Sequence, residues 1–503
     1  MTLSLIQEEI INTPGNLIVR ASAGTGKTFT MVQKIMKEIE ENNSHKVIAA
    51  ITFTIKAAQE IRKRLSCDTS QLFIGTNNSF AIEEIIKPFM KDVYGTDYDI
   101  DMDADYLKKV DTFKQGLSVL KTTGILASYS NTQKNFIFEL AYNIIVESTA
   151  CKLYFVSKYF KIYIDEYQDC DKDMHKLFMY LCEELIIDTF IVDDEKQSIY
   201  MWRGAFPDAF KEIWKKDNFE NLFMRENYRS CQQIQNYTNL LCEDTSGLYY
   251  KIDNSNNIVW LTIDSNELWS EKVLEVIDKA GQSALLRYRM VDAKLGASEL
   301  TQKGLEYTFI PKVPISEIST ESAWLYKAIA NYCILEHYSV YDLVAVIPSG
   351  KYEDNSKITV IQKNLEEIEN AIETSDLLKF NVQVEELASY LNLSVRTEHL
   401  EKLYDTIDNT EYHVAFDTDI YRHTASTIHS AKGLEFDQVI VFAEDYRLDD
   451  NSSIFNHYVA SSRAKQKLII IKKKNYNANC FEANLKNIFS NYRIDFTDMV
   501  TIP

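Results

Sequence analysis

The chain has 503 residues and a formal net charge of −20, from 54 basic and 74 acidic side chains. This acidic excess excludes a broad cationic surface that wraps duplex DNA, although it is compatible with a local basic groove for phosphates. A hydrophobic content of 46% is enough for several cores, and the length predicts about three domains.

The first predicted elements are a short apolar strand at residues 16–20 and a helix with apolar periodicity from residue 28. Between them the letters ASAGTGKT match the phosphate-binding pattern G-x-x-x-x-G-K-[ST], with Ala21 in place of the first Gly. A Gly-rich loop between a strand and a helix N-terminus presents backbone N–H groups to a polyphosphate. We therefore expect a nucleoside triphosphate to contact the loop residues Ala23, Gly24, Thr25, Gly26, Lys27 and Thr28.

Two side chains of this loop and an acidic pair define the expected chemistry. Lys27 is expected to reach the β- and γ-phosphate oxygens, and the Thr28 hydroxyl to bind Mg²⁺. Residues 153–164 contain two stretches that we predict as strands, LYFV and KIYI, and they end at Asp165 and Glu166. At the carboxyl end of a parallel strand, Asp165 can hold Mg²⁺ and Glu166 can act as the base for the attacking water. The expected cofactors are ATP and Mg²⁺.

Further motifs follow along the chain, at residues 190–205 (FIVDDEKQSIYMWRGA), 227–230 (NYRS), 427–441 (TIHSAKGLEFDQVIV) and 458–467 (YVASSRAKQK). In this order and spacing they resemble the motor core of the UvrD/Rep-like, superfamily 1A, DNA helicases. Residues 52–61 and 75–80 resemble the Ia and Ib motifs of that family. The resemblance implies an α/β fold of two RecA-like P-loop lobes with parallel sheets, each carrying a reduced, mostly helical insertion.

The resemblance also implies roles around the nucleotide. Tyr228 would stack on the adenine, Gln7 would hydrogen-bond its edge, and Glu435 would contact the ribose. Gln197 would touch the γ-phosphate and report its loss to the DNA side. The implied catalytic set is Lys27, Asp165, Glu166, Gln197, Arg229 and Arg463. Its two arginines would stabilise charge on the transferring phosphoryl group, in a cleft between the lobes that closes on binding.

A track for single-stranded DNA is implied by the same motifs. Trp202 would be a stacking platform for an unpaired base and Phe53 a second one, and such stacking contributes about 1–3 kcal/mol per base whatever the sequence. The alternative for Trp202 is a buried core aromatic. The implied DNA contacts are Thr52, Phe53, Lys56, Ser79, Tyr200, Trp202, Arg203 and His429.

Three positions depart from the family pattern. Asp193 stands where Gly is usual, Asn78 replaces the usual His of motif Ib, and Phe29 replaces a common Arg after the loop. We expect these departures to alter DNA contacts and not to touch the ATPase centre.

The expected domains are the first lobe (1–83 and 151–221), a small helical insertion (84–150), the second lobe (222–309 and 416–503) and a reduced accessory insertion (310–415). The accessory insertion carries an acidic helical face with Glu366, Glu367, Glu369 and Glu373. Such a face is unsuited to gripping a duplex, so we expect the isolated chain to separate strands weakly.

The cysteines indicate the compartment. Eight are scattered along the chain, without a C-x-x-C pair or a Cys/His pattern of metal-ligand spacing, so we expect them to be reduced and expect no iron–sulfur cluster. The N-terminus has no charged-then-apolar leader, and no run of about 18 apolar residues occurs. We therefore expect a cytoplasmic protein that does not enter a membrane.

Several functions fit this combination. The first is an ATPase stimulated by single-stranded DNA that translocates, 3′ to 5′ by the resemblance, as a helicase or a DNA-repair translocase. The second is a sensor of DNA ends or strands that switches a partner nuclease. The compact chain resembles the helicase subunit of bacterial Gabija antiphage systems, whose partner is an OLD-family ATPase–nuclease. A catalytically inactive subunit is disfavoured, because the catalytic set is intact.

Overall fold

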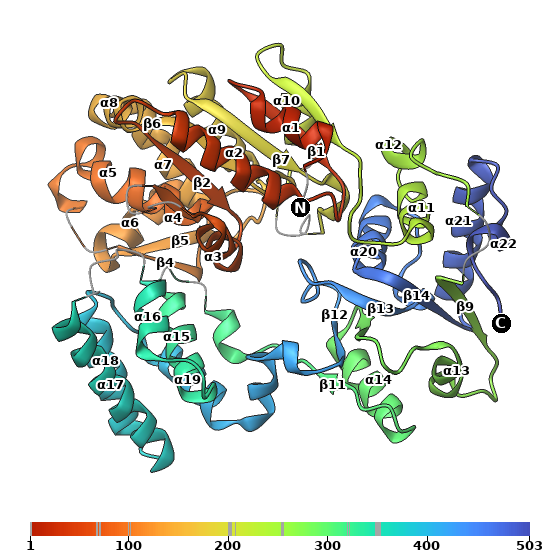
Figure 1. Cartoon of the computed structure of the whole chain (residues 1–503). Helices are drawn as coiled ribbons and strands as arrows, with labels where there is room; N and C mark the ends of the chain where they lie inside the picture. The colour runs from red at the N-terminus through yellow and green to blue at the C-terminus, as the bar shows by residue number, and fades with distance from the viewer. Residues whose placement is uncertain are drawn as a thin grey trace.

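The computed structural model describes residues 3–66, 69, 72–98, 100, 102–199, 204–206, 208–252, 256–318, 320, 322–347 and 354–503. Within them lie two six-stranded sheets and one two-stranded sheet, with helices packed around them (Figure 1). The predicted α/β class with parallel sheets is confirmed.

The first sheet has the order β3-β2-β6-β7-β1-β8 with every pair parallel. Its strands are β1 (Leu17–Ala21), β2 (Val47–Thr52), β3 (Phe73–Thr76), β6 (Tyr159–Ile164), β7 (Asp188–Asp193) and β8 (Glu220–Met224). Ile18 belongs to the core on one face, and its neighbours Leu17 and Val19 belong to the core on the other. Burial on both faces explains why these strands are continuous apolar runs.

Helices cover both faces of this sheet: α1 (Leu5–Asn12), α2 (Lys27–Glu41), α3 (Ile55–Arg64), α4 (Asn77–Ser79), α8 (Thr149–Lys158), α9 (Lys172–Glu183) and α10 (Asp208–Trp214). Two expectations need correction. The LYFV stretch is not a strand but part of α8, whose N-cap Ser148 accepts a hydrogen bond from Cys151 N. Strand β8 pairs with β1 up to Met224, so residues 222–224 belong to the first sheet and not to the second lobe.

The first insertion follows a π-helical segment, Phe80–Ile86. It contains α5 (Lys87–Tyr94), β4 (Asp103–Val110), α6 (Phe113–Thr123), β5 (Ile125–Tyr129) and α7 (Phe136–Glu147). Strands β4 and β5 form a parallel pair, which the expectation of a helical insertion did not include. Its apolar residues join the core on one face of the first sheet, so the insertion is held firmly to the first lobe.

The second sheet has the order β11-β12-β10-β13-β14-β9, again with all pairs parallel. Its strands are β9 (Ile258–Ile263), β10 (Ser283–Arg287), β11 (Thr308–Phe309), β12 (His423–Thr427), β13 (Phe436–Phe442) and β14 (Ala464–Lys473). The surrounding helices are α11 (Gln232–Leu240), α12 (Glu243–Ser246), α13 (Trp269–Val276), α14 (Met290–Gln302), α20 (Asn451–Ser461), α21 (Tyr476–Asn491) and α22 (Phe496–Met499).

The accessory insertion is helical and has its own core. Its helices are α15 (Ala323–Ile334), α16 (Val340–Val346), α17 (Asn355–Glu373), α18 (Leu377–Tyr390) and α19 (Thr397–Asp408). An ion pair between Arg396 and Asp105 joins it to strand β4, on the same side of the molecule in Figure 1. Among the residues that the structure describes, no helix combines the length and apolar composition needed to cross a bilayer.

Candidate active site between the two lobes

The Gly-rich loop connects β1 to α2, as expected. Gly24 and Gly26 adopt φ values of +78° and +82°, a left-handed region that is strained for other residues. The Thr25 hydroxyl donates to Ser22 O at 2.9 Å and braces the loop from within. Gln7 Nε2 lies 3.4 Å from Thr25 O, which brings the glutamine of α1 beside the loop.

Gly24 is closely packed against its neighbours, so the effect of adding a side chain at this position can be predicted. A Cβ atom there would lie 2.5 Å from Asn227 Oδ1 and 2.7 Å from Arg229 Cβ. Asn227 Oδ1 accepts from Arg229 N and Ser230 N, so it is not free to move away. Gly24→Ala is therefore expected to weaken ATP binding about tenfold or more, measured by titration with a fluorescent ATP analogue.

Gly304→Ala is the matched control for this variant. Gly304 has a φ of +91°, but nothing lies within 4 Å of the position that a Cβ atom would take there. The substitution therefore introduces comparable backbone strain far from the loop, and ATP affinity should stay at the wild-type level. Equal affinity in the two variants would contradict the steric account of Gly24.

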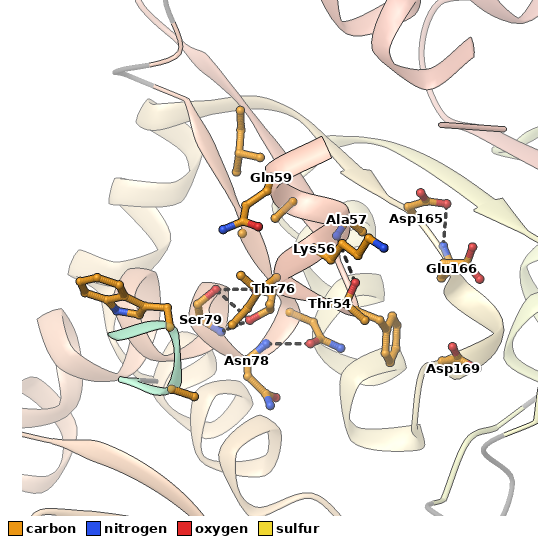
Figure 2. A pocket seen from close by; sticks show the side chains of 18 of the residues that line it. Thr54, Lys56, Ala57, Gln59, Thr76, Asn78, Ser79, Asp165, Glu166 and Asp169 are labelled. Atoms are coloured by element: carbon orange, nitrogen blue, oxygen red, sulfur yellow. Dashed lines mark hydrogen bonds between the residues drawn. The ribbon is translucent and has the colours of Figure 1, made fainter. Parts of the chain in front are cut away.

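The acidic pair lies at the carboxyl end of β6, next to the loop. Thr28 Oγ1 donates to Asp165 Oδ2 at 3.2 Å, and Lys27 Nζ lies 3.4 Å from Glu166 Oε1. Glu166 has a φ of +56°, an unusual conformation for this residue type, and its backbone N–H donates to Asp165 Oδ1 (Figure 2). Uncommon backbone conformations of this kind concentrate at functional sites, because the surrounding structure must hold them in place.

The ionisation of these groups follows from burial and neighbouring charge. Burial and the adjacent Glu166 raise the pKa of Asp165. Burial acts in the same direction on Glu166, but the ammonium groups of Lys27 and Lys432 outweigh it and lower the pKa of that carboxyl. Glu166 is therefore ionised at neutral pH, held between two lysines.

The residues present fit a magnesium–triphosphate group. The buried Lys27 Nζ makes the ion pair with Glu166 but no complete hydrogen bond within the described residues, so it has donor capacity for phosphate oxygens. Across those same residues, no cluster of three or more His, Cys, Asp or Glu could hold a metal alone. Mg²⁺ commonly takes one or two protein oxygens and completes its shell with phosphate and water, and Thr28 with Asp165 suits that pattern.

Residues of the second lobe complete the site. Arg463 is 1% exposed, and its Nη2 lies 3.4 Å from Gln197 Oε1. Burial and the nearby Arg229 lower the pKa of Arg463 to about 10, which leaves it charged at neutral pH. Arg229 forms an ion pair with Glu435, with Nη2 2.6 Å from Oε1. The expected arginine and ribose-contacting residues are thus paired with each other in this conformation.

One cross-lobe contact was not anticipated. Lys432 Nζ lies 2.7 Å from Asp169 Oδ2 and 3.1 Å from Gln197 O, and 3.8 Å from Glu166 Oε2. Lys432 and Asp169 both belong to motifs that the sequence already singles out, TIHSAKGLE and IDEYQD. Their position inside those motifs was the available signal, but their pairing depends on the packing of two distant chain segments.

Tyr228 is 53% exposed beside the loop, and its backbone N–H donates to Gly24 O at 2.8 Å. An exposed aromatic ring attached to the phosphate loop has room for an adenine on its face. Its hydroxyl contacts Glu226, and burial together with that carboxylate raises the pKa of Tyr228. The adenine role remains a prediction.

A groove of about 2970 Å³ connects this site to the expected DNA residues. Its walls include Lys27 and Glu166 of the nucleotide site and Phe53, Lys56 and Ser79 of the expected DNA contacts. Residues of both insertions, such as Tyr106 and Arg396, also line it. In the view of Figure 2, Lys56 lies between Ser79 and the acidic pair.

The residues that we expected to contact DNA differ in their accessibility. His429 lines the groove, with its ring 6.1 Å from that of Tyr288. Thr52 is fully buried and its hydroxyl donates to Thr54 O at 2.9 Å, so the structure does not place it where DNA could reach it. Three expected contacts lie outside the described residues, namely Tyr200, Trp202 and Arg203.

The structure also shows the surroundings of Asn78 and Asp193, two of the three residues that depart from the family pattern. Asn78 Nδ2 donates to Tyr106 Oη, so it links the groove wall to β4. Asp193 is 1% exposed; burial and Asp194 raise the pKa of its carboxyl well above the usual range, and the charge of Lys27 opposes them. That this departure leaves the ATPase centre untouched stays a prediction.

Comparison with known proteins gives matches over most of the chain. A family model described as the UvrD/REP helicase N-terminal domain matches residues 3–137 and 135–218, and one described as the UvrD-like helicase C-terminal domain matches residues 423–471. The Gabija protein GajB of Bacillus cereus (strain VD045) is 40% identical over 490 residues, which cover 96% of this chain and 98% of that protein.

More distant matches are also helicases. The ATP-dependent DNA helicase Rep of Buchnera aphidicola subsp. Schizaphis graminum is 27% identical over 372 residues, covering 63% of this chain and 56% of that one. The ATP-dependent DNA helicase PcrA of Staphylococcus aureus (strain Mu50) is 24% identical over 290 residues, covering 48% and 39%.

Proposed function

The chain belongs to the UvrD/Rep family of ATP-dependent DNA helicases, and we propose that it is a translocase stimulated by single-stranded DNA that moves 3′ to 5′. The continuous groove from Lys27 and Glu166 to Lys56 and Ser79 is the observation that carries this proposal. A strand bound along its far end would lie in the same cavity as the nucleotide, which gives the two ligands a physical route for mutual influence.

The roles proposed at the nucleotide are supported by the contacts described above. The loop backbone and Lys27 would bind the β- and γ-phosphates, and Thr28 with Asp165 would hold Mg²⁺, which would supply positive charge against the phosphoryl oxygens. Glu166 accepts a proton from the attacking water. The ion pair with Lys27 lowers the proton affinity of Glu166 until the lysine turns to the phosphates. Glu166 would therefore become an effective base only when the triphosphate is bound.

The arginines are proposed to act through lobe closure. Arg463 comes from the second lobe and already lies beside Gln197 of the first. Arg229 would exchange Glu435 for the γ-phosphate when nucleotide enters, which frees the glutamate for the ribose. This exchange of partners would make closure depend on the triphosphate.

A biological setting is proposed from the relative at 40% identity. We infer a role in bacterial antiphage defence, in the cytoplasm, with a separate nuclease subunit of the OLD-family type as partner. Exposed acidic residues on α17, with Glu366 and Glu373 among them, offer a surface suited to a basic protein and unsuited to duplex DNA. Weak unwinding of long duplexes by the isolated chain is expected for the same reason.

The test is the ATPase rate with and without single-stranded oligonucleotides. We expect a several-fold rise with DNA, and faster displacement of streptavidin from a biotin at the 5′ end of a strand than at the 3′ end. A rate that ignores DNA until a nuclease subunit is added would instead support the DNA-sensing NTPase alternative. Vigorous unwinding of long duplex by the chain alone would contradict the proposed weakness of the accessory insertion.

A further inference from the structure

Tyr458 is a second-lobe residue whose side chain contacts the phosphate loop. It lies on α20 and is 2% exposed. Its hydroxyl accepts a hydrogen bond from the backbone N–H of Ala23 at 3.1 Å, across 435 residues of sequence. The same hydroxyl lies 3.4 Å from Asp194 Oδ2, to which it donates. One side-chain oxygen thus joins the phosphate loop, the segment after β7 and the second lobe.

Asp194 is the centre of a buried network on the first-lobe side. Gln197 Nε2 donates to Asp194 Oδ2 at 2.6 Å, which ties the carboxylate to the expected γ-phosphate sensor. Lys196 Nζ lies 3.5 Å from Asp194 Oδ1 and donates to Ser22 Oγ at 2.8 Å, and it lies 5.2 Å from the centre of the Tyr458 ring. The loop is therefore held twice, at Ser22 by Lys196 and at Ala23 by Tyr458.

Such a network responds as a unit. Each member is buried, so a hydrogen bond broken by lobe movement leaves a polar group without water to replace its partner. Separation of the lobes would withdraw the Tyr458 hydroxyl from Ala23 and Asp194 at the same time. The conformation of the loop and the position of the Gln197 segment are consequently linked to the relation between the lobes.

We propose that Tyr458 is a positioning residue that couples the phosphate loop to the Asp194–Gln197 segment across the lobe interface, and so transmits DNA occupancy to hydrolysis. This inference rests on the proposed function, because it concerns DNA stimulation of the same site. Tyr458 acts through Ala23 and Asp194 and has no contact with a reacting atom.

The test compares two tyrosines that each lose only a hydroxyl. Tyr458→Phe is expected to lower the ratio of DNA-stimulated to DNA-free kcat about tenfold or more, because it removes the buried hydrogen bonds to both Ala23 and Asp194, with KM for ATP changed less than about twofold. Tyr446→Phe is the control, because the buried Tyr446 hydroxyl has no hydrogen-bond partner within the described part of the chain. The control should match wild type, and thermal unfolding confirms that both variants are folded.

A second readout keeps this inference separate from DNA stimulation. Hydrogen exchange of peptides covering residues 451–461 is measured with and without a non-hydrolysable ATP analogue. Wild type and Tyr446→Phe should gain protection, and Tyr458→Phe should lose most of that gain. Identical behaviour of the two variants in both measurements overturns the role of Tyr458. A wild type that ignores DNA but shows the exchange difference would overturn the proposed function and retain the link from Tyr458 to the loop.

Discussion

Replacement of Lys27 by alanine is expected to lower kcat for ATP hydrolysis about a thousandfold or more, with and without DNA. The ammonium lies 3.4 Å from Glu166 Oε1 at the N-terminus of α2, where phosphate oxygens would lie. Its loss removes the side-chain charge that the loop offers to the transferring group. Phosphate release measured in single turnover gives the rate, and retention of most activity would exclude Lys27 from the chemistry.

The same variant carries a signature in stability. Burial lowers the pKa of Lys27, but the carboxylates of Glu166, Asp194 and Asp165 outweigh it, and the net shift is upward. The lysine therefore stabilises the fold at neutral pH, and this contribution is lost only as pH rises through its raised pKa. Without it, the buried carboxylates repel one another and bind protons more readily. The unfolding temperature of Lys27→Ala should therefore fall further below that of wild type between pH 6 and pH 8, because the carboxylates of the folded variant lose their protons over this range. A difference in unfolding temperature that does not depend on pH would contradict this account.

Glu166→Gln is expected to lower kcat about a hundredfold to ten-thousandfold while ATP still binds. Glutamine has nearly the same shape, but it cannot take a proton from water. It also removes the carboxylate that pairs with Lys27, so the lysine becomes more available to phosphate and ATP affinity should hold or rise. Titration with a labelled ATP analogue and single-turnover hydrolysis measure the two effects separately.

Glu336→Gln serves as the control for that substitution, because Glu336 is an exposed residue of the accessory insertion. It changes the same charge at a distance and should leave kcat at the wild-type value. Weakened ATP binding in Glu166→Gln, in proportion to its lost rate, would show that Glu166 holds the substrate and does not serve as the base.

Much of this site could be predicted because its parts are local in sequence. The strand, the Gly-rich loop and the helix that bind phosphate are consecutive, and Asp165 and Glu166 directly follow the strand that presents them. The LYFV stretch was misjudged for a physical reason: aromatic and β-branched residues suit a strand, but Ser148 caps a helix there, which buries Phe155 and leaves Leu153 and Val156 exposed. The β4–β5 pair was missed because half of the residues of β4 are charged.

The cross-lobe contacts could not be predicted in this way. Lys432 meets Asp169 across 263 residues, and Tyr458 meets Ala23 across 435. Each residue lies in a recognisable motif, but the identity of its partner depends on how the two sheets face one another.

Ala21 shows that the first position of the phosphate-binding pattern can change without a change in the conformation of the loop. It is the last residue of β1, fully buried and in register with Met224 of β8, so it needs neither a positive φ nor an absent side chain. The conformational demand falls on Gly24 and Gly26. A pattern search that insists on glycine at the first position would pass over this chain and others like it. A search for the shorter G-x-G-K-T core, preceded by a buried strand and followed by a helix, would retrieve them.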